Sequence, residues 1–161
     1  MMIKRFEHLY TIYNNAFKYT PIIYSFYREY LGQEKDILLS YLILPLVLGE
    51  ESKKSLINSK SNSNLYTFCR KKENLIGLPQ MIKEYKSITN ECIQYGCDRG
   101  LFEISASLHV SALESPNDFS FDESEEFKAA QKFAHIVRTT DIPTIYRHLG
   151  VAELWKVLLN T

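Results

Sequence analysis

The run Ile37–Leu48 reads ILLSYLILPLVL, in which Ser40 is the only polar residue, and GEESKKSL follows it directly. A helix that crosses a bilayer needs about 20 consecutive apolar residues, so this run is too short to span a membrane. It is also too apolar for a surface helix, which keeps a polar face toward water. We therefore expect a buried helix that is capped by Asp36 and that kinks or ends near Pro45.

Length and composition indicate a single domain, residues 1–161, with enough apolar side chains for one core. A net charge of +0 argues against nucleic-acid binding through overall charge, and it favours association with a stable partner. The three cysteines form no regular framework, and residues 1–10 lack the apolar core and cleavage site of a signal peptide. We expect free thiols, a cytoplasmic location and no membrane contact.

The spacing of apolar residues predicts a mainly α (α+β) fold that begins with a helical part over residues 1–50. From residue 8 to residue 31, aromatic and aliphatic side chains recur every three or four positions. A helix that begins near Thr20 would place Pro21 in its first turn, and Gly32 would end it. The next stretch, 53–72, is predicted to be rich in loops.

A second part, about 65–113, has the order of a winged helix. Helices are predicted near 79–85 and 87–97, and the alternating pattern LFEISASLHVSAL predicts a short β-hairpin within 101–113. The second helix carries few cations on its outer face, so protein contact fits this segment better than the reading of a DNA sequence.

The third part, 122–161, is predicted to be helical. Its sequence DESEEFKAAQKFAHIVRTT has the acidic first turn and the apolar stripe of a helix, with Asp122 or Ser124 as N-cap. A last helical piece begins at Asp141 and ends with VAELWKVLL.

Charge is segregated along the chain even though the total is zero. The stretch 53–72 holds six Lys or Arg and no acid, whereas 103–126 holds seven acids and no Lys or Arg. These two segments form either two electrically opposite faces or two solvated loops.

The sequence contains none of the common catalytic motifs: no phosphate-binding loop, dinucleotide-binding glycine pattern, nucleophile elbow or zinc-protease helix. Cys92 and Cys97 are too far apart for a zinc knuckle and fit a buried small side chain and a helix-end thiol. We therefore expect no enzymatic activity, no cofactor and no metal. An enzyme would require His135, His148 and Asp141 to converge in one pocket.

Several segments carry a family resemblance. Asn14-Asn15 precedes an aromatic helix, ILLSYLILPLVLGEESKKSL follows, and SNLYTFCRKKENLIGLPQMIKEYKSITNECIQYGCDRGLFEI comes after a polar gap. Over about 13–113 this order resembles the middle component of bacterial ABC three-component systems, of which the Lamassu anti-phage systems are relatives. Leu-Pro-Leu-Val-Leu at 44–48 is the most specific piece. Ala16 and Gly49 depart from the family, which commonly has Pro and His there.

The resemblance implies a non-catalytic adaptor subunit that links an SMC- or Rad50-like ABC ATPase to an effector, expected to be a nuclease, in anti-phage defence. The alternative is a winged-helix subunit that binds nucleic acid or senses DNA, and DNA could also reach the chain through the complex. The candidate partner contacts are Tyr24, Tyr27, Tyr30, Glu123, Glu125 and Glu126. The candidate nucleic-acid contacts are Lys53, Lys54, Arg70, Lys71 and Lys72.

Overall fold

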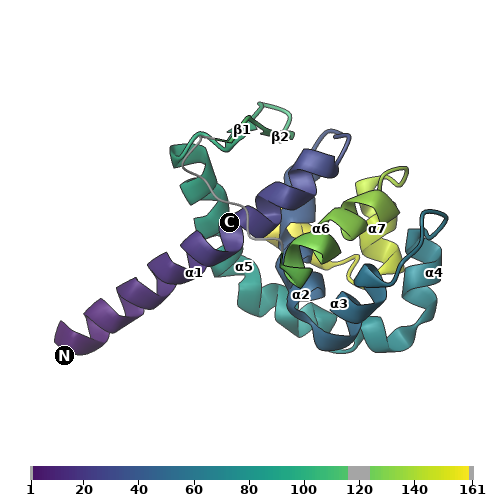
Figure 1. Cartoon of the computed structure of the whole chain (residues 1–161), viewed down its shortest axis with the longest axis horizontal. Coiled ribbons are helices and arrows are strands. Elements are labelled where there is room, and N and C mark those ends of the chain that lie inside the picture. Colours follow the sequence, from purple (N-terminus) through teal and green to yellow (C-terminus); the bar gives the residue numbers. More distant parts are fainter. Residues whose placement is uncertain (1, 116–123, 160–161) are drawn as a thin grey trace.

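The computed structural model describes residues 2–115 and 124–159, and of the side chains those of residues 16–115 and 124–158. The mainly α prediction with one short hairpin is confirmed (Figure 1). The described helices are α1 (Met2–Glu29), η1 (Asp36–Leu39), α2 (Ser40–Leu48), α3 (Glu50–Ile57), α4 (Leu65–Arg70), η2 (Lys72–Leu75), α5 (Leu78–Asp98), α6 (Glu125–Ile136), α7 (Ile142–His148) and α8 (Leu154–Leu159). The strands are β1 (Phe102–Ile104) and β2 (Val110–Ala112).

Helix α2 lies in the centre of the core, as its sequence predicts. Leu42, Ile43, Leu44, Leu46 and Val47 are fully buried, because α5, α3, α6 and α1 all pack around this short helix. An apolar helix without a polar face requires such surroundings. The helix includes the proline at position 45 and ends three residues later, at Leu48.

Helix α1 is longer than predicted. It runs without a break from Met2 to Glu29, so Pro21 lies inside the helix and not in its first turn. A proline there removes the hydrogen bond to the carbonyl of Phe17. Packing of the C-terminal half of α1 against α5 and α6 offsets this loss. Figure 1 shows the N-terminal end of α1 extending away from the other elements.

The expectation that Asp36 caps the apolar run is wrong. The N-cap of η1 is Lys35, and Asp36 is the first residue of this helix. Instead, the carboxylate accepts hydrogen bonds from the backbone N–H of Gln33 (3.1 Å) and of Val110 (2.7 Å). The sequence predicted that Asp36 caps the helix next to it, but in the structure its carboxylate binds the distant Val110.

Two further boundaries correct the sequence-based expectations. Much of 53–72 is helical, since it includes the C-terminal half of α3 and all of α4, and a capping box between Asn64 and Thr67 starts α4. Helix α5 is a single helix, so the separate helices predicted near 79–85 and 87–97 do not exist. Ser87, the first residue of the second predicted helix, lies on the exposed face of α5.

The β-hairpin predicted within 101–113 is confirmed. Strand β1 pairs with β2 in antiparallel register, with Phe102 opposite Ala112 and Ile104 opposite Val110. Phe102 is buried, and the hairpin packs against α5 and α1. The helix-then-hairpin order of a winged helix is therefore present, but the turn predicted between helices 79–85 and 87–97 is not.

The C-terminal helices begin where their capping residues predict. The Ser124 hydroxyl accepts a hydrogen bond from the backbone N–H of Phe127, and Asp141 caps α7 at the N–H of Thr144. The alternative cap, Asp122, lies outside the described residues.

Candidate interaction surfaces

The three tyrosines proposed as a partner surface lie in the core. Tyr24, Tyr27 and Tyr30 are 1%, 4% and 9% exposed. The Tyr27 hydroxyl donates to the backbone carbonyl of Asp36 at 2.7 Å, and burial raises the pKa of this phenol well above its ordinary value. The expectation that these rings form an exposed contact surface is therefore corrected: they fill the space between α1 and its neighbours.

The acidic candidates belong to an intramolecular contact. The ammonium of Lys53 lies 3.5 Å from the carboxylate of Glu126 and 3.8 Å from that of Glu125, which joins α3 to α6. The backbone N–H of Glu126 itself, together with Lys53, holds the pKa of Glu126 below its ordinary value. The predicted basic segment 53–72 and acidic segment 103–126 are therefore in contact through these ion pairs. Glu123 lies outside the described residues.

The remaining basic candidates divide among three environments. Lys54 pairs with Glu50 one turn earlier on α3, at 3.6 Å. The guanidinium of Arg70 lies over the ring of Tyr66, 5.9 Å from its centroid. Lys71 and Lys72 are exposed. Of the five predicted nucleic-acid contacts, the structure places Lys54 and Lys71 at one pocket.

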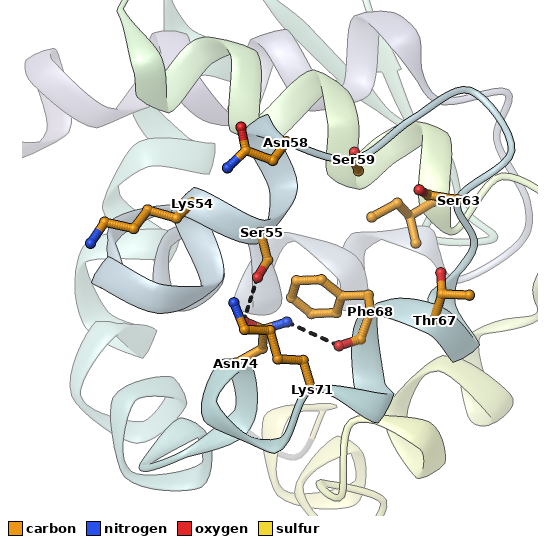
Figure 2. Close-up of a pocket in the computed structure, with 10 residues that line it drawn as sticks. Lys54, Ser55, Asn58, Ser59, Ser63, Thr67, Phe68, Lys71 and Asn74 are labelled. Atoms are coloured by element: carbon orange, nitrogen blue, oxygen red, sulfur yellow. Dashed lines mark hydrogen bonds between the residues drawn. The ribbon is translucent and has the colours of Figure 1, made fainter.

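This first pocket has a volume of about 410 Å³ and lies between α3, α4 and α6. Its residues are Lys54, Ser55, Asn58, Ser59, Ser63, Thr67, Phe68, Lys71, Asn74 and Ile136. Figure 2 shows Asn74 between Ser55 and Phe68. Asn74 is 4% exposed, accepts a hydrogen bond from the Ser55 hydroxyl (2.8 Å) and donates one to the carbonyl of Phe68 (3.0 Å). These two hydrogen bonds make this part of the pocket wall polar and rigid.

A second pocket, of about 310 Å³, also borders the loop 58–63. Its residues are Ile57, Lys60, Ser61, Lys128, Gln131, Lys132 and His135. Sequence reasoning missed its α6 cations, although Lys128, Lys132 and His135 are spaced four and three residues apart and so share one helix face. The signal that could have found them is this row of basic residues on α6. Sequence reasoning considered only the acidic first turn of the same helix.

An exposed aromatic cluster lies where α4 faces α7. Tyr66 is 60% exposed, carries Arg70 over its face and contacts the ring of His148 edge-on at 6.5 Å. We call Tyr66, Arg70 and His148 the Tyr66 cluster. Tyrosine and arginine are the residue types that most often anchor protein interfaces.

The dispersed titratable groups have separate partners. His135 donates from Nε2 to the carbonyl of Ser61 at 2.9 Å, and Asp141 caps α7. Within the described part of the chain, no group of three histidine, cysteine or acidic side chains is placed to hold a metal ion. Burial raises the pKa of the Cys69 thiol to about 11 and that of Cys92 to about 12.

The sequence matches the family described as the ABC-three component (ABC-3C) system Middle Component 3, over residues 3–153. The chain belongs to this family. The Middle Component 3 match includes α6 and α7, so it extends beyond the resemblance over about 13–113 into the C-terminal third. No curated protein and no solved structure matches the chain. Among the described residues, none of the helices of this Middle Component 3 chain is both long and apolar enough to cross a membrane.

Proposed function

We propose that this chain is a non-catalytic adaptor that links an SMC- or Rad50-like ABC ATPase to an effector nuclease in a Lamassu-like anti-phage system. The observation that carries the proposal is the family match, because a middle component belongs to a system of several components. In this role the chain contributes surfaces that bind the partner proteins and no catalytic residues. ATP- and DNA-dependent movement of the ATPase would then release or activate the effector.

The surfaces proposed for these partners differ from the buried tyrosines. The Tyr66 cluster offers an exposed aromatic ring with a cation over it, and such a ring can bury a large area at a small cost in side-chain entropy. Phe17, on the outer face of α1, is 59% exposed and meets the ring of Tyr95 edge-on at 6.4 Å. Each side chain is aromatic and accessible, as an anchor for a partner must be.

Co-expression with the products of the neighbouring genes tests the adaptor role. The wild-type chain is expected to co-elute with an ATPase and an effector in gel filtration. Substitution Tyr66→Ala is expected to weaken one of these contacts by about 2 kcal/mol, or roughly 30-fold in Kd, because a central aromatic anchor contributes about that much. Gln80→Ala, which removes an exposed side chain bonded within α5, is the control. If the chain elutes separately from both co-expressed neighbours, the proposal is contradicted.

A second candidate function is nucleic-acid binding within the same complex. The two pockets beside the loop 58–63 favour it, because lysines gather there in a chain without net charge. Binding that weakens steeply with salt would support it. Since this readout uses the isolated chain, it is independent of the co-elution experiment.

A further inference from the structure

We propose that the loop 58–63 and the two pockets beside it form a binding surface for consecutive phosphates of a nucleic-acid backbone, with α6 supplying half of the site. This inference rests on the second candidate function and specifies its residues. It replaces the expected site, in which all the cations came from 53–72. The cations that carry it are Lys60, Lys71, Lys128 and Lys132.

The charge of the two pockets has one sign. Among the described residues, no aspartate or glutamate lines either pocket, and none forms an ion pair with these four lysines. Lys53 and Lys54 are excluded from the site, since the first is held by Glu126 and Glu125 and the second by Glu50. Figure 2 shows Lys54 pointing away from the other residues of the first pocket. Ammonium groups that no carboxylate neutralises are what phosphate neutralisation requires.

The loop between the pockets is fixed in place from α6. The ammonium of Lys132 donates to the carbonyl of Ser59 at 3.1 Å, and His135 donates to that of Ser61. Within the loop, the backbone N–H of Lys60 donates to the Ser63 hydroxyl at 2.9 Å. The two pockets are therefore held at a constant separation before any ligand arrives, which reduces the entropy lost on binding.

The neutral groups of the first pocket suit a phosphate oxygen. The Ser63 hydroxyl accepts the loop hydrogen bond, so its own hydrogen is available to donate outward. The Asn58 amide is exposed on the pocket rim. Asn74 keeps the pocket wall rigid because its oxygen and its nitrogen are each already hydrogen-bonded. Hydroxyl and amide donors of this kind position the backbone without reading its sequence.

Two separate pockets favour a polymer over a single nucleotide. Lys71 lies at the first pocket, whereas Lys60, Lys128 and Lys132 lie at the second. A ligand that neutralises both groups must carry phosphates at both pockets. A nucleic-acid strand does so at every nucleotide, and its binding releases one set of counterions per neutralised phosphate.

The test measures fluorescence anisotropy of a labelled DNA duplex of about 20 base pairs and of its single strand, with the full chain, between about 50 and 200 mM salt. The double variant K60Q/K128Q is expected to lower the slope of log K against log salt by about 2, because each lost lysine contact removes about 1. Neither side chain fixes the loop, so the fold is retained. The double variant K18Q/K83Q removes the same charge from exposed positions elsewhere and is expected to leave the slope unchanged.

Three results would overturn the inference. The first is the absence of binding to both DNA forms at the lowest salt, which also removes the second candidate function. The second is a slope that K60Q/K128Q lowers by no more than K18Q/K83Q does, which leaves nucleic-acid binding standing but does not assign it to the two pockets. The third is full displacement of the DNA by equimolar ATP, which identifies a site for a single nucleotide. None of these results bears on co-elution with the ATPase and effector.

Discussion

The Nδ1 atom of His109 lies 2.7 Å from the carboxylate of Asp36, so the β-hairpin is fastened to the segment that follows α1. The same carboxylate, which is fully buried, also accepts the backbone N–H of Val110 at the start of β2. A hairpin of two three-residue strands has little stability of its own. Its position therefore depends on this polar contact as well as on the packing of Phe102.

Substitution Asp36→Ala is expected to lower the free energy of unfolding by about 3 kcal/mol, because it leaves the buried N–H of Val110 and the partly buried N–H of Gln33 without an acceptor. Urea denaturation followed by circular dichroism measures this loss. Glu34→Ala, at an exposed position two residues earlier, is the control and is expected to change the value by less than about 0.5 kcal/mol. Equal effects of the two substitutions would contradict the role given to the carboxylate.

Gly96→Ala is expected to destabilise the protein, although alanine is the better helix former by about 1 kcal/mol. A Cβ atom at this position of α5 would overlap the ring of Phe102, and it would lie 3.4 Å from Thr20. Overlap in a packed core costs about 1 to 3 kcal/mol, which exceeds the gain in helix propensity.

The double variant G96A/F102L separates the two effects. A smaller side chain at position 102 makes room for the added methyl group, so Gly96→Ala is expected to be less destabilising in the Phe102→Leu background than in the wild type. Urea midpoints of the four proteins in this cycle provide the comparison. If Gly96→Ala stabilises the wild-type chain, the contact between α5 and the hairpin is looser than the structure indicates.

The features that could be predicted from sequence are those set by local chemistry. The run Ile37–Leu48 had to be buried whatever surrounded it, since no side of it is polar. Ser124 and Asp141 mark the starts of α6 and α7 because a cap hydrogen bond needs only the next three residues. The β-hairpin could be predicted for a similar reason, because apolar and polar residues alternate over 101–113 and turn residues lie on both sides of this stretch.

The features that sequence could not supply depend on long-range packing. Whether α5 breaks near Ser87 is settled by the continuous burial of its inner face against α1 and α2. The three tyrosines at the C-terminal end of α1 and just after it, Tyr24, Tyr27 and Tyr30, had the spacing of a contact face, but that face is covered by the protein itself. Lys128 and Lys132 lie at the basic site because α6 packs beside the loop 58–63, a contact that the sequence does not reveal.

Cys92 is expected to resist thiol reagents until the protein unfolds. Burial raises the pKa of its thiol to about 12, so the reactive thiolate is nearly absent at pH 8. Labelling followed by mass spectrometry is expected to modify partly exposed Cys97 first and Cys92 only at the rate of unfolding. Addition of urea should make the two rates equal. Equal rates in native buffer would contradict the burial of this side chain.

Lys53→Gln is expected to lower the free energy of unfolding by about 1 kcal/mol at pH 7, because it removes the cation between α3 and two carboxylates of α6. The pKa of Glu126 is lowered in the folded chain, so its contribution is fully present above the ordinary glutamate value of about pH 4.3. That contribution is lost as the pH falls through the lower folded pKa. The difference between wild type and variant should therefore shrink in acid. Urea midpoints at pH 7 and pH 3 measure it, and a difference of equal size at both values would show that Lys53 stabilises the helix pair by packing and not by charge.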